Sequence, residues 1–360
     1  MLPHPTPITA SAAALAPAAH EQSSSQGATL TQVATFEQQV TGVAVTPDGR
    51  IFVNFPRWEE DVAISVGELK DGRVTPYPNA EWNAWRNAKP LSRGDHLICV
   101  QSVFSDGRGN LWILDPAAPG NEFNLDGGPK LVRVDLKTDQ VAQVVLFDRT
   151  AVPQGSYLND VRISPDGAHA YITDSGIRGA LIVVELESGR ASRLLDGDAS
   201  TQVEPDVQVK IDGKPLKRPD GRGPMFAADG IAMTATHLYW QALTGRTLYR
   251  LPLGLLNAPP ANLATRVERV GTTCVADGLW SDAKGRFWVT SPEDNSVKHR
   301  MPDGTLRIAV QDKRLRWPDT MAEGADGSLY VTSSQIQDMA QFHDHGSTRT
   351  EPYALWKFTA

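Results

Sequence analysis

A short pattern recurs six times along this chain: an apolar strand, a turn of small polar residues, and a second strand that carries an aromatic side chain. The copies are GVAVTPDGRIFV (42–53), SVFSDGRGNLWIL (102–114), DVRISPDGAHAYIT (160–173), DGIAMTATHLYWQ (229–241), DGLWSDAKGRFWVT (277–290) and DTMAEGADGSLYVT (319–332). Successive copies are roughly 40 to 70 residues apart, which is the size of a four-stranded sheet with its loops. The repeat therefore predicts an all-β fold, a six-bladed β-propeller with one blade for each copy.

The turn chemistry and the strand chemistry of the repeat agree. Pro-Asp-Gly and Asp-x-x-Gly turns supply a preset φ, a capping side chain and a residue that tolerates positive φ. Val, Ile, Tyr and Trp on either side suit a half-buried pleated surface, so each copy is predicted to be a hairpin. A ring of blades must close, and we expect TLTQVATF (29–36) to pair with YALWKF (353–358) for that purpose.

The chain of 360 residues is predicted to hold one propeller domain over 29–360. Residues 1–28 are rich in Ala, Ser and Pro, and we interpret them as a disordered or signal-like tail. This favours a periplasmic or secreted protein, with a cytoplasmic one as the alternative. Cys99 and Cys274 are expected to be two separate buried thiols, and a disulfide between them is the other reading.

Charge and hydropathy exclude two classes of partner. The formal net charge of −7 is spread along the chain without a basic stripe, which argues against nucleic acid. No apolar run approaches the roughly eighteen residues that a membrane span requires. A small-molecule substrate or ligand is the partner that remains.

The first strand of each blade lines the central channel of a propeller, so equivalent positions at its start form a ring at one mouth. Aligning the turns places Thr41, Gln101, Asp160, Asp229, Asp277 and Asp319 at equivalent positions. Neighbouring carboxylates resist joint ionisation unless a cation or ligand compensates their charge. We therefore predict a divalent cation, with Ca²⁺ first, held by Asn159, Asp160, Asp229, Asp277 and Asp319, since hard cations prefer oxygen ligands.

These residues also have simpler explanations. Asp at the head of a strand is a common turn or capping residue that binds backbone N–H groups instead of a ligand. Trp58 and Trp317 are predicted to wall a substrate pocket together with Gln101, but packing between blades is the alternative for each Trp.

Several segments resemble the major royal jelly protein and Yellow family. They include VNFPRW (53–58), VQSVFSDGRGNLWILD (100–115), AYITDSG (170–176) and LRWPDTM (315–321), and the similarity runs from about residue 33 to the C-terminus. The resemblance implies a six-bladed propeller. It leaves the activity open, because insect members of the family resemble dopachrome-converting enzymes, others bind biogenic amines, and others are nutritive.

A more distant resemblance is to the gluconolactonase and regucalcin group, whose axial Glu, Asn and Asp hold a divalent metal. NDVRISPDG (159–167) is similar to the Asn-Asp segment of that group, and ADGIAM (228–233) to its Asp-Gly segment. The first-blade position where that group has its metal-binding Glu is Thr41 in this chain. The lactonase mechanism is in doubt for that reason.

Two classes of function follow from the sequence. The first is a cation-assisted small-molecule enzyme, a tautomerase (isomerase) or a lactonase (hydrolase), with Asp229 and Asp277 as the catalytic residues. The second is a non-catalytic protein that binds a small polar or aromatic amine in the same mouth, where carboxylates would pair with the ammonium group.

Overall fold

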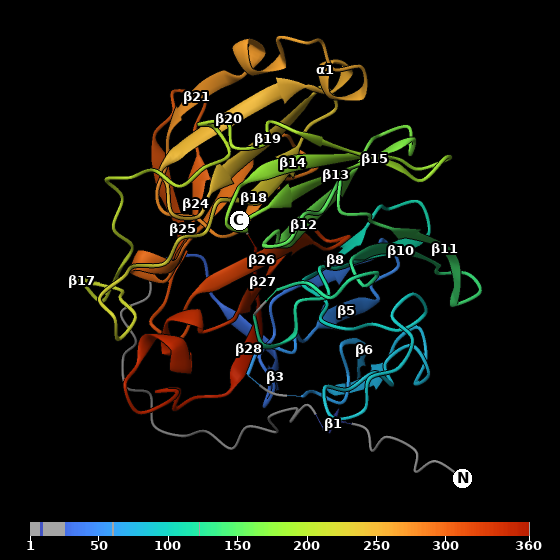
Figure 1. The fold of residues 1–360 in the computed structure, drawn as a ribbon. Helices are drawn as coiled ribbons and strands as arrows, with labels where there is room; N and C mark the ends of the chain where they lie inside the picture. Colours follow the sequence, from blue (N-terminus) through green and yellow to red (C-terminus); the bar gives the residue numbers. More distant parts are fainter. Residues whose placement is uncertain (1–7, 10–25, 60, 122, 360) are drawn as a thin grey trace.

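The computed structural model describes residues 8–9, 26–59, 61–121 and 123–359, and in them six antiparallel sheets surround a central axis (Figure 1). The predicted six-bladed propeller is confirmed. Each copy of the repeat supplies the two inner strands of one blade, joined by the predicted turn.

The blades are numbered in chain order of their inner strands. Blade 1 is β4 (Val43–Val45), β5 (Ile51–Asn54), β6 (Val66–Lys70) and β7 (Arg73–Pro76), and blade 2 is β8 (Ser102–Ser105), β9 (Asn110–Asp115), β10 (Lys130–Asp135) and β11 (Gln140–Leu146). Blade 3 is β12 (Leu158–Ile163), β13 (His169–Asp174), β14 (Ala180–Glu185) and β15 (Arg190–Leu194), and blade 4 is β18 (Ala228–Met233), β19 (His237–Ala242), β20 (Thr247–Pro252) and β21 (Glu268–Thr272). Blade 5 is β22 (Leu279–Ser281), β23 (Phe287–Ser291), β24 (Ser296–Arg300) and β25 (Leu306–Gln311), and blade 6 is β26 (Pro318–Glu323), β27 (Ser328–Ser333), β28 (Tyr353–Thr359) and β3 (Thr31–Phe36).

The ring closes in blade 6, where strands from opposite ends of the chain pair. Antiparallel pairing of β28 with β3 sets Leu355 opposite Ala34 and Tyr353 opposite Phe36. The predicted closure is thus confirmed. It covers the outer edge of β28 with β3 and ties the two ends of the ring together in one sheet.

The repeated turns have the predicted chemistry. In the first copy, Thr46 and Arg50 are joined by a backbone hydrogen bond of 3.0 Å, and Gly49 has a φ of 88° that suits glycine. In blade 5, Asp282 closes the turn on backbone N–H groups and also accepts a 2.9 Å hydrogen bond from Nε1 of Trp288. The repeated aromatic is therefore tied to the turn that precedes it.

The hydrophobic core lies between adjacent blades. One cluster joins Trp112 and Leu131 of blade 2 to Val161, Ile172 and Ile182 of blade 3, all of them buried. Burial of this kind is available only to a blade with neighbours, because a lone sheet leaves one apolar face in water.

Smaller elements decorate the ring. They are β1 (Ile8–Thr9), which pairs with β7, β2 (Gln26–Gly27), which pairs with β25, the hairpin of β16 (Lys210–Ile211) and β17 (Lys214–Pro215), the helix α1 (Leu253–Asn257), and 3₁₀ turns at Pro119–Asn121, Leu263–Arg266, Pro292–Asp294, Ile336–Asp338 and Ala340–Phe342. The remainder of the predicted tail over 1–28 lies largely outside the described residues.

Cys99 and Cys274 are buried free thiols, as expected. Among the described residues, no helix has the length and apolar character needed to cross a bilayer.

Candidate functional site

Three inner strands, β12, β18 and β26, begin with a β-bulge near the axis. In β12, Leu158 pairs with Asp174 and Val161 with Ile172, so Asn159 and Asp160 together oppose a single residue, Thr173. The same shift occurs in β18 and β26. In blade 5 the N–H groups of Asp277 and Gly278 both bond Oγ1 of Thr290. Bulges of this kind re-aim side chains and are common beside active sites.

The bulges correct one position of the predicted ring. The equivalent residues in the structure are Thr41, Gln101, Asn159, Asp229, Asp277 and Asp319. The sequence alignment assigned Asp160 to blade 3, and this was wrong by one residue, because matching the turn at 164–167 to the turn at 46–49 puts Asn159, not Asp160, at the position of Thr41. The ring therefore holds three carboxyls and two amides, not four carboxyls.

Close packing explains the repeated Asp-Gly pair. A Cβ atom on Gly230 would lie 2.3 Å from the carbonyl oxygen of Asp277, and one on Gly278 would lie 2.1 Å from that of Asp319. Each Asp of these bulges thus sits where the backbone of the next blade approaches most closely. Close packing between blades therefore explains the glycine of this motif, whatever the chemical role of the aspartate.

Asp229, Asp277 and Asp319 form a buried acid cluster. Burial raises the pKa of Asp229 well above its usual range, and the charges of Asp277, Asp160 and Asp319 raise it further. Burial and the charge of Asp277 likewise raise the pKa of Asp319. No N–H or O–H donor from a described residue reaches Oδ2 of Asp319.

Asp277 lies at the centre of this cluster. Burial raises the pKa of Asp277 to about 7, less than full burial alone would, because Trp317 and the two neighbouring carboxyls hydrogen-bond to its carboxylate. Nε1 of Trp317 lies 2.6 Å from Oδ2 of Asp277. The pKa of Asp277 thus lies near neutrality, whereas those of Asp229 and Asp319 are raised well above the usual range of Asp.

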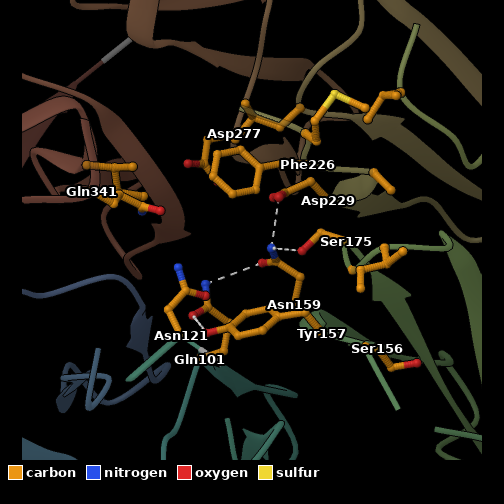
Figure 2. A pocket seen from close by; sticks show the side chains of 18 of the residues that line it. Gln101, Asn121, Ser156, Tyr157, Asn159, Ser175, Phe226, Asp229, Asp277 and Gln341 are labelled. Carbon is orange, nitrogen blue, oxygen red and sulfur yellow. Dashed lines mark hydrogen bonds between the residues drawn. The ribbon is translucent and has the colours of Figure 1, made fainter. Parts of the chain in front are cut away.

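A chain of hydrogen bonds leads from the cavity wall to this cluster (Figure 2). Trp58 Nε1 donates to Tyr157 Oη at 2.7 Å, and Tyr157 Oη donates to Gln101 Oε1 at 2.9 Å. Gln101 Nε2 faces Asn159 Oδ1 at 3.5 Å, and Asn159 Nδ2 donates to Asp229 Oδ2 at 2.8 Å. The chain fixes the amide orientations, so that Asn159 presents a donor to Asp229.

Asp160 lies beyond the ring, deeper in the channel. Its Oδ1 accepts a 2.9 Å hydrogen bond from Ser102 Oγ, and burial raises its pKa while the nearby Arg162 lowers it. The guanidinium of Arg162 in turn lies between the rings of Phe104 and Trp280, at 5.2 and 5.3 Å from their centroids. This buried layer fills the channel behind the acid cluster.

A cavity of about 690 Å³ opens in front of the cluster. Its floor contains Asp229, Asp277 and Asp319. Its walls include residues 155–157, Asn159, residues 175–177, Ile336, Met339 and Gln341. The long connection 196–226 carries the hairpin of β16 and β17 and contributes several residues to the wall: Gln202, Val203, Arg218, Arg222, Gly223, Met225 and Phe226.

The structure brings most of the predicted site residues to one place. Gln101, Trp58, Asn159, Asp229, Asp277 and Asp319 line the cavity. Asp160 and Trp317 do not, because Asp160 lies behind the ring and Trp317 is fully buried against Asp277. Trp317 is thus placed to orient a carboxyl and not to form a wall.

Sequence reasoning missed Tyr157, Ser175 and Arg218, which also line the cavity. Tyr157 stands two residues before Asn159, and alternation along a strand could have placed both side chains on one side. Burial raises the pKa of Tyr157 well above its usual range, so its hydroxyl is a neutral donor. Arg218 carries no local signal, because the connection to which it belongs has no repeat counterpart.

The donor chemistry at the mouth suits a hard cation, since it consists of carboxyl and amide oxygens. Within the described residues, however, no group of three or more His, Cys, Asp or Glu side chains is arranged to hold a metal ion. Instead, the carboxyl of Asp277 hydrogen-bonds with those of Asp229 and Asp319. The predicted Ca²⁺ stays a prediction.

The family follows from a match to the major royal jelly protein model over residues 98–351, which is more than half of the chain. The chain belongs to the major royal jelly protein family. It is 28% identical over 159 residues to dopaminechrome tautomerase of Drosophila melanogaster, covering 41% of this chain and 34% of that protein. The match thus spans about a third of this relative.

Solved structures of bacterial enzymes share the fold of this family member. A gluconolactonase from Xanthomonas campestris superposes with a TM-score of 0.53 at 13% identity, over 92% of this chain and 89% of that one. A virginiamycin B lyase from Staphylococcus aureus superposes with a TM-score of 0.52 at 12% identity, over 92% and 99% of the two chains. At this identity the likeness describes the architecture alone.

Proposed function

We propose that this protein is an enzyme that moves a proton within a small carbonyl-containing substrate, a tautomerase or isomerase of the axial mouth. The observation that carries the proposal is Asp277, a buried carboxyl with a pKa raised to about 7 that accepts a hydrogen bond from Trp317 and lies between two carboxyls whose pKa values are also raised. A group that ionises near neutral pH is suited to act as a general base. Similarity to a dopaminechrome tautomerase supports the same class.

The two carboxyls have complementary roles. Asp277 as carboxylate takes a proton from a carbon next to a carbonyl or iminium group, and the C–H electron pair forms the new double bond. Asp229 as neutral acid gives its proton to the oxygen or nitrogen that receives charge. The proton on Asp277 then passes to Asp229 through the hydrogen bond between them, which restores the starting state.

The surrounding residues hold this pair in position. Asn159 donates to Oδ2 of Asp229, and Trp317 donates to Oδ2 of Asp277, so each carboxyl has one oxygen fixed and one turned toward its neighbours or the cavity. Preorganised donors around buried acids lower the cost of reorganisation during the reaction.

Turnover of dopaminechrome and dopachrome, followed by loss of the chrome absorbance, tests the proposal. Asp277→Asn should lower kcat by about 10²–10⁴, the range of a lost general base. Asp326→Asn removes a carboxyl from an exposed turn and should leave kcat unchanged. Full activity of Asp277→Asn would contradict the assignment.

Hydrolysis of aldonolactones in the same assay series addresses the lactonase alternative, in which Asp277 would deprotonate water instead of carbon. A protein that only binds an amine would show a rise in melting temperature with amines and no turnover of either substrate class. Ca²⁺ held by Asp229, Asp277, Asp319 and Asn159 is a separate proposal. A cation bound there would keep these carboxyls in their ionised form.

A further inference from the structure

The outer rim of the axial cavity exposes large apolar side chains. Ile177, Met225 and Phe123 are 79%, 64% and 58% exposed, the highest values among the large hydrophobic residues that the structure describes, and all three line this cavity. Single exposed apolar residues are ordinary, but a group around one opening marks a binding surface. The rim is therefore suited to contact an apolar part of a bound molecule.

The three rim residues come from separate loops. Phe123 follows the 3₁₀ turn after β9, Ile177 lies between β13 and β14, and Met225 ends the connection that precedes β18. Three independent loops thus each place one apolar side chain at the same opening. None of these positions serves the hydrophobic core of a blade, since each is solvent-exposed.

A positive charge lies in the same outer wall. Arg222 is paired with Asp220 at 2.5 Å, whereas Arg218, half-buried in the wall, forms no ion pair with any side chain in the described part of the chain. The acid cluster lies at the opposite, inner end of the cavity. Opposite charges at the two ends orient a bound molecule that carries an anionic group.

The size of the cavity fits a molecule with more than one part. Pockets of about 300–1,000 Å³ accommodate drug-sized ligands, and this cavity measures about 690 Å³. A bicyclic chrome of roughly a dozen heavy atoms would occupy the inner end and leave the rim uncovered.

We propose that the natural substrate is an amphipathic anion: its reacting carbonyl end faces the acid cluster, its bulky aromatic or polycyclic body lies against Phe123, Ile177 and Met225, and its carboxylate pairs with Arg218. The reacting end rests on the proposed function. The contacts of the body and the anion do not, because they are made by other residues.

Two fluorescent probes that differ by one charge test this. 8-Anilinonaphthalene-1-sulfonate carries an anionic group, and N-phenyl-1-naphthylamine has the same ring skeleton without it. Titration and calorimetry should show one site for each probe. Arg218→Gln should weaken binding of the sulfonate about tenfold and leave the neutral probe unchanged, since charge-assisted hydrogen bonds are worth at least that much.

Matched variants separate the contribution of Arg218 to probe binding from that of the three apolar rim residues. Arg190→Gln alters an exposed arginine of β15 that is paired with Glu185 and does not line the cavity, and it should change neither affinity. The combined variant Phe123→Ser, Ile177→Ser and Met225→Ser should weaken both probes about tenfold, whereas Leu146→Ser, on the exposed face of β11, should weaken neither. Melting temperatures report whether each variant folds.

The outcomes also distinguish this inference from the proposed function. Asp277→Asn should lose turnover and keep both probes at wild-type affinity. Equal weakening of the two probes by Arg218→Gln, or unchanged affinity in the rim variant, would overturn the amphipathic-anion proposal whatever the activity shows. Full turnover by Asp277→Asn would overturn the catalytic assignment and leave the probe results standing.

Discussion

Nε1 of Trp317 donates a 2.6 Å hydrogen bond to Oδ2 of Asp277, and both side chains are buried. Trp317 has a φ of 50°, in the left-handed region that bulky residues rarely occupy. The residue that follows, Pro318, begins β26, so the unusual backbone turns the indole back toward the neighbouring blade. Strain of this kind is found where a side chain must be held for function.

Replacement of Trp317 by Phe should move the pH dependence of catalysis. The lost donor stabilised the ionised form of Asp277, so its pKa should rise above about 7, by roughly one unit. The rising limb of kcat/KM against pH should shift upward by the same amount, and the plateau should be little changed. Steady-state kinetics between pH 5 and 9 measure this shift.

The control is Trp288→Phe. Trp288 also donates from Nε1 to a carboxyl, that of Asp282, but in the turn between β22 and β23 of blade 5. The Trp288→Phe variant therefore loses similar packing and a similar hydrogen bond, but away from the acid cluster. An equal shift of the pH profile in both variants would mean that Trp317 has no specific effect on Asp277.

Asp277→Asn should change how stability depends on pH. The folded pKa of about 7 lies above the ordinary Asp value of 3.8, so between these two values the native state binds more protons than the unfolded state. The contribution of Asp277 to the free energy of unfolding is therefore complete below pH 3.8 and is lost as pH rises through 7. Asn does not titrate, so the variant does not lose this part of the free energy of unfolding as pH rises.

Urea unfolding at pH 5 and pH 8 measures the effect. Relative to wild type, Asp277→Asn should gain stability between the two pH values, on the order of a few kcal/mol. Asp326→Asn, with its lowered pKa in an exposed turn, should show no such gain. A constant difference between Asp277→Asn and wild type would indicate an ordinary pKa for this carboxyl.

The architecture follows from the repeat alone. Turn residues and aromatics recur in register, so the blade number, the hairpins and the closure of 29–36 on 353–358 could all be predicted from local pattern. These features depend on interactions within a blade or between neighbouring blades, which a periodic sequence repeats in each copy.

The site could be predicted only in part. Asp229, Asp277 and Asp319 share the register of the repeat, and they do meet at the axis. The two bulged residues of β12, Asn159 and Asp160, are both polar, and it is Asn159 that contacts Asp229 at the axis. Trp317 and Arg218 depend on a single unusual φ and on a non-repeating connection, and neither has a counterpart in other blades.

Divalent cations should reveal whether the acid cluster also forms a metal site. If Ca²⁺ binds Asp229, Asp277 and Asp319, EDTA should lower the melting temperature and excess Ca²⁺ restore it, in proportion to the logarithm of the free concentration. Asp319→Asn should weaken the Ca²⁺ response, since Oδ2 of Asp319 has no other donor among the described residues. Identical melting with EDTA and with Ca²⁺ would argue for protons as the counter-charges of the cluster.

Gly278→Ala should destabilise the propeller strongly. The added Cβ would lie 2.1 Å from the carbonyl oxygen of Asp319, a backbone atom of the next blade that has no freedom to withdraw. The expected loss is about 3 kcal/mol in the free energy of unfolding, the upper range for overpacking. Gly254→Ala is the matched control, because its Cβ meets no atom within 4 Å and the residue lies in α1, where Ala is favoured over Gly. Urea denaturation of the two variants should therefore give shifts of opposite sign, and equal small shifts would show that the blades can separate at the acid cluster without loss of stability.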